Sequence, residues 1–265
     1  MTSVYFYTTI SVLIVSLVSF TGIFTLSLND KVLRRSIFVL VSLAAGALLG
    51  DALLHLVPEA FEKGGITPRI SLLVIGGILL FFIIEKFFHW HHFHGREEEE
   101  AHEHLHEHLS PEALHRQVHP IGQMILFSDG FHNFIDGLII GASYLVSIEV
   151  GIATTIAIIL HEIPQEIGDF GVLLHAGYSK GKALFFNFLS ALSSVVGAGL
   201  ALALGGVGEN FIALIIPIAA GGFIYVAGSD LIPELHKTTD LGRSLVQLLG
   251  IIAGVLAMFL LLLLN

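Results

Sequence analysis

Two histidines, an aspartate and a glutamine occupy matching positions on two strongly apolar segments in the middle of the chain. His132 and Asp136 are four residues apart in the first segment, and His161 and Gln165 are four apart in the second. A spacing of four residues puts two side chains on the same face of an α-helix. Imidazole nitrogens and carboxylate or amide oxygens are donors to divalent transition metals. If the two faces meet, they form a metal site.

The two segments are predicted to form an antiparallel helical hairpin with a turn near residues 147–149. Ser147 stands almost midway along the sequence between His132 and His161. At about 1.5 Å rise per residue, both imidazoles lie about 20 Å from the turn. They are therefore expected to be level with each other.

The number of acids in these two apolar segments favours a metal-binding role for their polar residues over a structural role. A single helical His is more often a hydrogen-bonded core residue than a ligand. However, an ionisable side chain inside a membrane span costs about 2.5 kcal/mol or more, and it indicates function by default. The two segments contain no Lys or Arg, yet away from the turn they carry five acids: Asp129, Asp136, Glu162, Glu166 and Asp169. A cation is needed to neutralise at least some of them.

The composition predicts an all-α polytopic membrane protein. The chain is 54% hydrophobic and only 13% charged, which is unlike a soluble domain. A helix needs about 20 apolar residues to span a bilayer, and the first such segment is interpreted as a retained helix because it lacks the basic start of a signal peptide. The absence of cysteine excludes disulfides and thiolate metal sites. We expect eight transmembrane helices, at 5–28, 36–60, 70–90, 119–145, 148–176, 181–205, 209–235 and 242–264.

The chain is accordingly divided into four parts. Residues 1–88 hold helices one to three, 89–119 form a loop, 120–176 hold helices four and five with the metal site, and 177–265 hold helices six to eight. Ten of the 12 basic residues fall at junctions on one side, and only Lys63 and Arg69 fall on the other. By the positive-inside rule, both termini are outside and the loop is cytoplasmic, in a plasma or inner membrane.

The loop at 89–119 is rich in His and Glu. It holds ten of the 15 histidines, and seven of the 22 acids lie within 97–112. Such a composition cannot build a core, so the loop is expected to be disordered or frayed helix. It is interpreted as a metal-buffering or sensing segment, with a solvated spacer as the alternative. The histidines concerned are His89, His91, His92, His94, His102, His104, His106 and His108.

An internal repeat relates the second and seventh predicted helices. The tripeptide AAG occurs at 44–46 and 219–221, and HLVPE at 55–59 matches DLIPE at 230–234, so both matches have the same offset along the chain. The two helices run in opposite directions, so the repeat is inverted, as in transporters whose binding site lies between the repeats.

Polar residues on several helices are predicted to form a metal pathway or to support the site. The second helix carries Asp51, His55 and Glu59 at four-residue steps, which indicates either a metal-lined track or a buried hydrogen-bond ladder. Pro58, Pro164 and Pro233 each remove a helical hydrogen bond. Glycines at 137, 141, 168 and 171 are expected to allow close helix packing. The full set for pathway and support is Asp51, Glu59, Asp129, Glu166, Asp169, Asn187, Asp230, Glu234 and His236.

At these residues the chain resembles the ZIP family of zinc- and iron-regulated transporters. It is most similar to the subfamily whose fourth and fifth helices read HNFTDG and HEIPHELGDF. Here they read HNFIDG at 132–137 and HEIPQEIGDF at 161–170. GDALLHLVPEAF at 50–61 and GSDLIPELHK at 228–237 also look like that family's second and seventh helices, so the resemblance covers essentially the whole chain.

The resemblance implies a 3+2+3 inverted-repeat bundle that carries divalent metal into the cytoplasm. The primary site implied is His132, Asp136, His161 and Gln165, with His55 close by. A second, adjacent site would use Asn133, Asp136, Glu162 and Gln165. The chain has Gln165 where relatives have His or a bridging Glu, and its sixth helix has no acid, with Asn187 and Ser190 as the nearest polar substitutes. Both departures favour one ion over two.

The expected function is therefore transport of Zn²⁺, with Fe²⁺, Mn²⁺, Co²⁺ and Cd²⁺ also suited to the site. The alternatives are an intramembrane metalloenzyme, because His161 and Glu162 resemble the start of HExxH, and a metal-sensing or channel-like protein. We expect no enzymatic activity. The expected partners are metal ions and the lipid bilayer, with a homodimer allowed and nucleic acid excluded, because the basic residues are scattered.

The loop generates a first prediction. Deleting residues 89–119 should leave metal transport largely intact while removing several weak zinc sites, because the hairpin geometry needs none of the loop histidines. Calorimetric zinc titration and vesicle uptake on the deleted protein check this. Loss of all uptake with normal expression would place the loop in the pathway.

Overall fold

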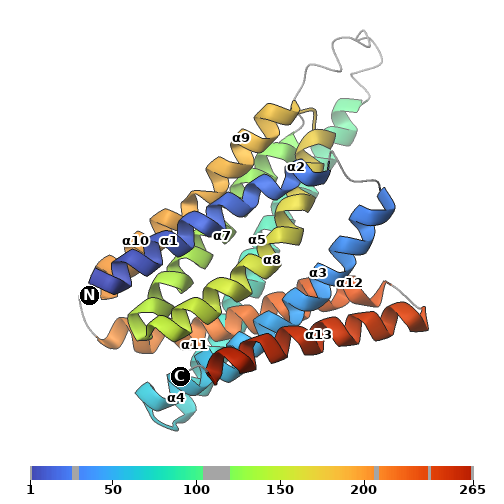
Figure 1. Ribbon diagram of the computed structural model, residues 1–265. Helices are drawn as coiled ribbons and strands as arrows, with labels where there is room; N and C mark the ends of the chain where they lie inside the picture. Colours follow the sequence, from blue (N-terminus) through green and yellow to red (C-terminus); the bar gives the residue numbers. More distant parts are fainter. Residues whose placement is uncertain (1, 26–29, 104–119, 206–208, 238–239, 264–265) are drawn as a thin grey trace.

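A computed structural model describes residues 2–25, 30–103, 120–205, 209–237 and 240–263 as a bundle of helices (Figure 1). The described residues contain no strand, so the all-α prediction is confirmed. The helices pack as two groups, each built around long, closely paired helices.

The first group, called the α8 group, carries the predicted metal ligands. In it α7 packs against α8, α9 and α10, and α1 packs against α8 and α10. Its members are α1 (Thr2–Val18), η1 (Ser19–Thr21), α2 (Gly22–Thr25), α7 (Pro120–Val146), α8 (Ile148–His175), α9 (Lys180–Ala191) and α10 (Ser193–Gly205).

The second group, called the α3 group, pairs α3 with α13 and α5 with α11. The two groups meet mainly where α3 lies against α8 and where α11 lies against α7. Its members are α3 (Asp30–Asp51), η2 (Ala52–Leu56), α4 (Val57–Gly64), α5 (Pro68–Glu103), α11 (Glu209–Val226), η4 (Ala227–Leu231), α12 (Ile232–His236) and α13 (Leu241–Leu262).

The predicted hairpin is formed by α7 and α8. Only Ser147 separates the two helices, and it caps α8 because its side-chain oxygen accepts a hydrogen bond from the Val150 backbone N–H at 3.1 Å. Such a cap satisfies one of the unpaired donors at the start of a helix. The turn therefore needs no loop, which keeps the two helices in a defined register.

The prolines act differently from one another. The π-helical segments η2 and η4 come just before Pro58 and Pro233, where the missing N–H would interrupt an α-helix. In contrast, α8 continues through Pro164 to His175. The helix that carries His161 is thus kept continuous on both sides of the site.

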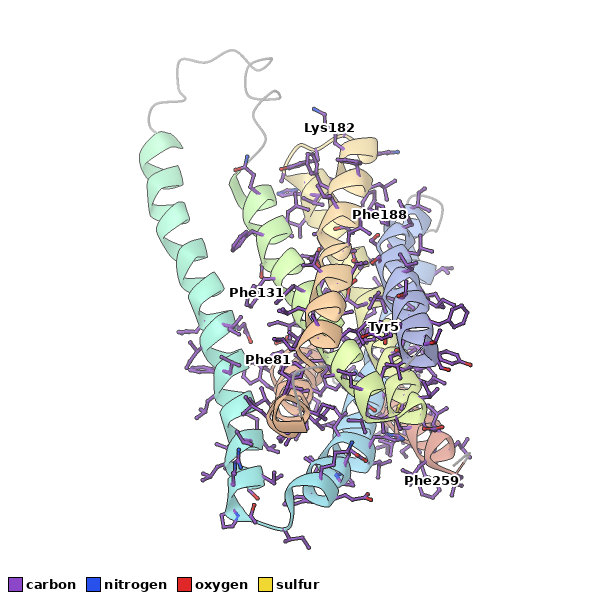
Figure 2. The ribbon with its side chains drawn as sticks, turned by 90° about the vertical axis from the view of Figure 1, so that its left-hand side faces the viewer. Tyr5, Phe81, Phe131, Lys182, Phe188 and Phe259 are labelled. Carbon is purple, nitrogen blue, oxygen red and sulfur yellow. The ribbon has the colours of Figure 1, made fainter. Side chains whose placement is uncertain are left out.

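Six helical stretches of the described chain are long and apolar enough to cross a membrane, and large exposed hydrophobics such as Tyr5 and Phe259 cover the outside of the bundle (Figure 2). The six are Thr2–Thr21, Ser36–Gly64, Pro68–Lys86, Lys180–Gly205, Phe211–His236 and Leu241–Leu262. The helices α7 and α8, of 27 and 28 residues, are also long enough but carry the acids. The molecule has the outer surface of an integral membrane protein.

Two ends of the bundle are distinguished below. The α9 end is where α5, α8 and α12 finish and where α3, α7, α9 and α13 begin, and the α4 end is the opposite one, toward which both chain termini lie (Figure 1). The helix α5 continues to Glu103, so the predicted loop begins in helical structure, and its remaining part, residues 104–119, lies outside the described residues.

Glycines allow the main helix pairs to approach closely. A Cβ on Gly137 of α7 would lie 1.8 Å from the Ser194 carbonyl oxygen, and one on Gly197 of α10 would lie 1.9 Å from the Phe134 carbonyl oxygen. The same kind of contact occurs between α3 and α13 at Gly46 and Gly254, and between α5 and α11 at Gly77 and Gly221. The expectation for Gly168 and Gly171 was wrong, since neither has a neighbour within 4 Å of a built Cβ.

These contacts predict that Gly197→Ala lowers stability by about 1–3 kcal/mol, because the added methyl forces α7 and α10 apart. Thermal unfolding of the purified protein in detergent measures the effect. The matched control is Gly199→Ala on the same helix, where a Cβ meets nothing within 4 Å. Equal Tm values for the two variants would contradict this view of the packing.

Candidate metal site

Two imidazoles and two carboxylates converge between α7 and α8. The Nε2 atoms of His132 and His161 are 3.3 Å apart, as their similar distances from Ser147 predict. The Asp136 Oδ2 atom lies 3.1 Å from His161 Nε2 and 3.8 Å from His132 Nε2. The Glu162 Oε1 atom lies 3.5 Å from His132 Nε2 and 3.6 Å from His161 Nε2. These four residues are called the histidine cluster.

The hydrogen bonds around the histidine cluster join its two imidazoles but do not reach its inward-facing carboxylate oxygens. The Nδ1 atom of His161 lies 3.3 Å from the Ala157 carbonyl oxygen, to which it donates. This contact assigns the ring proton to Nδ1 and leaves the Nε2 lone pair facing the cluster. Asp136 Oδ2 and both Glu162 carboxylate oxygens are buried and accept no hydrogen bond from any residue that the structure describes. The lone pairs of these three oxygens are therefore available to a cation.

The separations match the coordination shell of zinc. Ligand atoms in a tetrahedral site with bonds near 2.0–2.1 Å are roughly 3.3 Å apart. The five distances from the imidazole nitrogens range from 3.1 to 3.8 Å. All four ligand atoms lie within 4.8 Å of one another. A divalent cation at their centre would satisfy the unpaired oxygens and nitrogens together.

A second group of acids adjoins the histidine cluster and shares Glu162 with it. Carboxylate oxygens of Asp129, Glu162 and Glu166 also lie within 4.8 Å of one another, and all three residues are buried. Polar neutral side chains hold two of these acids in place. Asn133 Nδ2 donates to Asp129 Oδ1 at 2.9 Å, the Ser190 hydroxyl donates to Asp129 Oδ2, and Asn187 Nδ2 donates to Glu166 Oε2. Asp129, Glu162 and Glu166, together with their donors Asn133, Ser190 and Asn187, are called the acidic group.

Gln165 lies beside the acidic group. Its Nε2 atom is 3.5 Å from Asp129 Oδ1. Glu162, the residue that follows His161, therefore makes the contacts with both imidazoles that were predicted for Gln165. Asn187 and Ser190, expected only as substitutes for an acid on the sixth helix, supply the hydrogen bonds from α9 to this group.

A cavity of about 580 Å³ opens from the histidine cluster toward the α9 end of the bundle. Its walls come from α3, α5, α7, α8 and the α11–α12 region, and the labelled Phe81 and Phe131 border it between α5 and α7 (Figure 2). Its polar lining consists of His132, His161, Gln165, Ser128, Tyr225 and the acids Glu85, Asp129, Asp169, Asp230 and Glu234. Among the described residues the lining contains no Lys or Arg, so the cavity favours cations.

The other predicted pathway residues fall at different places. Asp169, Asp230 and Glu234 line the cavity, whereas His236 is exposed at the end of α12. His55 is buried near the α4 end with its Nδ1 atom 3.4 Å from Asp51 Oδ1. Glu59 forms an ion pair of 3.3 Å with Lys63. The predicted loop histidines up to His102 lie on the last part of α5, and His104, His106 and His108 lie outside the described residues.

Glu85 and Tyr225 line the cavity but were not predicted from the sequence. Glu85 precedes Lys86 at the end of an apolar stretch, where it reads as the boundary of a span. The feature that could have identified Glu85 is its position near the end of the third predicted span, on the same side of the membrane as Asp230. Thr154, which bonds to Asp51, had no signal at all, because a threonine in an apolar helix is common.

The position of Gln165 generates a prediction. In Gln165→Glu, a new carboxylate beside Asp129 adds uncompensated negative charge to the acidic group, so the protein should bind a second zinc ion or bind the first at least roughly tenfold more tightly. Zinc stoichiometry and affinity on protein without residues 89–119 measure this. Gln165→Leu, which removes the amide without adding a ligand, is the control. Identical binding by both variants would show that position 165 does not influence the site.

Comparison with known proteins agrees with this geometry. The family described as ZIP Zinc transporter matches residues 2–262. The mouse (Mus musculus) zinc transporter ZIP4 is 35% identical over 254 residues, covering 76% of this chain and 38% of the relative. Zinc transporter ZIP13 of Pongo abelii is 37% identical over 236 residues, covering 83% of this chain and 65% of the relative.

A third relative carries a broader description. The metal cation symporter ZIP14 of Xenopus tropicalis is 32% identical over 291 residues, covering 86% of this chain and 62% of the relative. The chain thus spans between about two fifths and two thirds of the length of these three relatives. The match across the helices, with the imidazole and carboxylate residues on consecutive helices, shows that the chain is a membrane protein of the ZIP family.

Proposed function

We propose that this protein carries divalent transition-metal ions, above all Zn²⁺, through the membrane into the cytoplasm by alternating access to the histidine cluster. The observation that carries the proposal is that the four ligand atoms of the histidine cluster converge at the inner end of a cavity lined by acids. A resident structural metal would need no such path, whereas a transported ion must enter and leave.

Access to the site is one-sided. The cavity residues of α3, and most of those of α7 and α8, belong to the halves of those helices nearest the α9 end. Toward the α4 end, buried apolar side chains pack into one core, among them Leu48, Leu56, Ile140, Ile158 and Phe223. The Phe223 ring also stacks edge-on against the His161 ring, with centroids 6.4 Å apart. An ion at the site would exchange with the α9 end alone in this state.

Alternation needs a second state, and the two helix groups supply bodies that could move. Both metal-ligating helices belong to the α8 group, whereas most of the opposite cavity wall belongs to the α3 group. Glycine contacts make each group close-packed internally. Relative motion of the groups would open the α4 end and close the α9 end without disturbing the ligands.

The choice of ion and direction follows from chemistry and charge. Two imidazoles with two carboxylates suit Zn²⁺ and also Fe²⁺, Mn²⁺, Co²⁺ or Cd²⁺. The names of the relatives, which include zinc transporters and a metal cation symporter, point the same way. Most basic residues of the sequence flank the α9 end, which makes it the cytoplasmic side by the positive-inside rule.

The architecture proposed with this function has eight spans. The helices α7 and α8 add two spans to the six apolar ones, and their acids face the site between the groups. The order is then three spans, the α7–α8 hairpin, and three spans. The internal repeat of the AAG and proline-containing motifs relates the first three spans to the last three.

Uptake measurements test the function. Purified protein in liposomes should accumulate radioactive zinc, and His132→Ala or His161→Ala should each lower the initial rate by at least about tenfold, since each removes a ligand. The control is His175→Ala at the exposed end of α8. Near-normal uptake by either ligand variant would refute the site. Absence of uptake by the unaltered, folded protein would favour a sensor or an enzyme instead.

A further inference from the structure

The carboxylate of Asp129 differs from that of Glu162 in its hydrogen bonding. The Oδ1 atom of Asp129 accepts from Asn133 Nδ2 at 2.9 Å and from Gln165 Nε2 at 3.5 Å, and its Oδ2 atom accepts from the Ser190 hydroxyl. In contrast, both Glu162 oxygens accept no hydrogen bond from the described residues. A carboxylate whose two oxygens already receive protein donors has less capacity left for a metal ion. Asp129 is therefore better suited to hold other side chains in place than to bind the ion itself.

The contacts with Asp129 decide which end of each amide faces it. Because a carboxylate accepts hydrogen bonds, an amide that approaches it presents its NH₂ group. Asn133 directs this group entirely at Asp129, since its Nδ2 atom also lies 3.3 Å from the Asp129 backbone carbonyl oxygen. Gln165 presents its Nε2 atom to the same carboxylate from the opposite helix. The orientation of both amides is thus fixed by this network of donors and acceptors.

When the NH₂ group of an amide faces Asp129, its carbonyl oxygen faces away from it. Asn133 is fully buried, and its Oδ1 atom has no hydrogen-bond partner among the described residues. Gln165 lines the cavity together with His132 and His161. A buried carbonyl oxygen without a partner is unfavourable, and a cation would supply the missing interaction. The reverse orientation would turn the positive end of each amide toward the ion.

The hydrogen bonds of Asp129 join three helices beside the histidine cluster. Asp129 and Asn133 belong to α7, Gln165 belongs to α8, and Ser190 belongs to α9. One carboxylate therefore holds an amide from each of the two metal-ligating helices. The bond from α9 restrains the carboxylate itself, because it occupies the oxygen that the amides do not use.

We propose that Asp129 is a positioning residue for metal binding, whose carboxylate turns the carbonyl oxygens of Asn133 and Gln165 toward the ion and is not itself a ligand. The inference rests on the proposed function, since it concerns the ion that the histidine cluster would carry. It gives Gln165 an influence on that ion although the side chain lies against Asp129. Neutral oxygens held in this way attract the cation without adding a full charge, which suits an ion that must leave again.

Two neutral replacements of Asp129 separate positioning from direct binding. Asp129→Asn keeps an oxygen that can accept from both amides. Its new NH₂ group can donate to the Ser190 hydroxyl, whose own proton can remain with the Asn187 carbonyl oxygen 2.9 Å away. Asp129→Ala removes the acceptor altogether. Because both variants lose the same negative charge, a difference between them does not reflect charge.

The measurements are the visible absorption of bound Co²⁺, which depends on the ligands of the ion, and the affinity for Zn²⁺. They use the purified full-length protein in detergent, and a variant with His132→Ala and His161→Ala provides the signal of all other sites for subtraction. Asp129→Asn should keep the Co²⁺ spectrum of the unaltered protein. Asp129→Ala should change it and bind Zn²⁺ at least about tenfold more weakly than Asp129→Asn, as expected when a residue that orients metal ligands is lost.

A double-variant comparison shows whether Asp129 acts through Gln165. With Gln165→Leu in the background, the difference in Zn²⁺ affinity between Asp129→Asn and Asp129→Ala should fall below about threefold, because the amide that the acceptor orients is gone. A difference that stays at its full size would mean that Asp129 does not act through this amide, and it would contradict the proposal.

The matched control is Ser193→Ala. The Ser193 hydroxyl donates to the carbonyl oxygen of Gly130, the residue next to Asp129, in a bond that involves neither amide. Its loss should leave the Co²⁺ spectrum and the Zn²⁺ affinity unchanged. If thermal unfolding shows that Asp129→Ala does not fold, Asp129→Val, which also lacks an acceptor, takes its place.

Two results would overturn the positioning role. A Co²⁺ spectrum that is altered by Asp129→Asn would identify Asp129 as a ligand. Equal Zn²⁺ affinities of the Asn and Ala variants would show that the acceptor at position 129 does not matter. Both results concern equilibrium binding, so they would leave zinc uptake by the unaltered protein, and with it the proposed transport function, untouched.

Discussion

The burial of several carboxylates without a basic partner is the constraint on which the rest of this structure depends. The hairpin of α7 and α8 contains no Lys or Arg, yet Asp129, Asp136, Glu162 and Glu166 are all buried within it. Isolated charges in such surroundings are strongly disfavoured. Protonation or a bound cation must compensate them, and the two imidazoles beside these carboxylates make a transition metal the cation that we propose.

The surrounding helices satisfy this constraint incompletely, which suits a transported ion. Neutral donors from Asn133, Ser190 and Asn187 take up part of the hydrogen-bonding capacity of Asp129 and Glu166. The oxygens of Glu162 accept no hydrogen bond within the described part of the chain. A site that was fully satisfied by protein would have little affinity for metal, and one with no donors would hold metal too firmly. The intermediate case permits binding and release.

Close packing and local irregularity are divided between different parts of the bundle. Reciprocal glycine contacts join α7 to α10, α3 to α13 and α5 to α11, so the helices within each group are closely packed. The Thr154–Asp51 hydrogen bond lies where the groups face each other, whereas the π-helical segments pack mainly within the α3 group, η2 against α11 and η4 against α3. In the proposed alternating access, motion between the groups would occur at an interface that carries this polar contact, and the ligand residues would stay together inside one group.

Sequence alone accounts for the features that depend on distance along a helix. Apolar length predicts the helices, the spacing of four residues puts His132 with Asp136, and the similar distances of His132 and His161 from Ser147 predict that their rings are level. The measured 3.3 Å between the two Nε2 atoms agrees with this counting. The sequence also shows that the five acids of these two segments have no Lys or Arg on the same helices, which predicts that a cation compensates their charge.

Tertiary structure decided what depends on the rotation of each helix about its axis and on its neighbours. Glu162 contacts both imidazoles, whereas Gln165 lies against Asp129, because packing turned α8 so that residue 162 faces α7 directly. Contacts of Glu166 with Asn187, of Asp129 with Ser190 and of Asp51 with Thr154 join residues at least 21 positions apart. Periodicity assigns a face to each residue within one helix. It contains no information about which other helix that face meets, since this is set by the packing of the whole bundle.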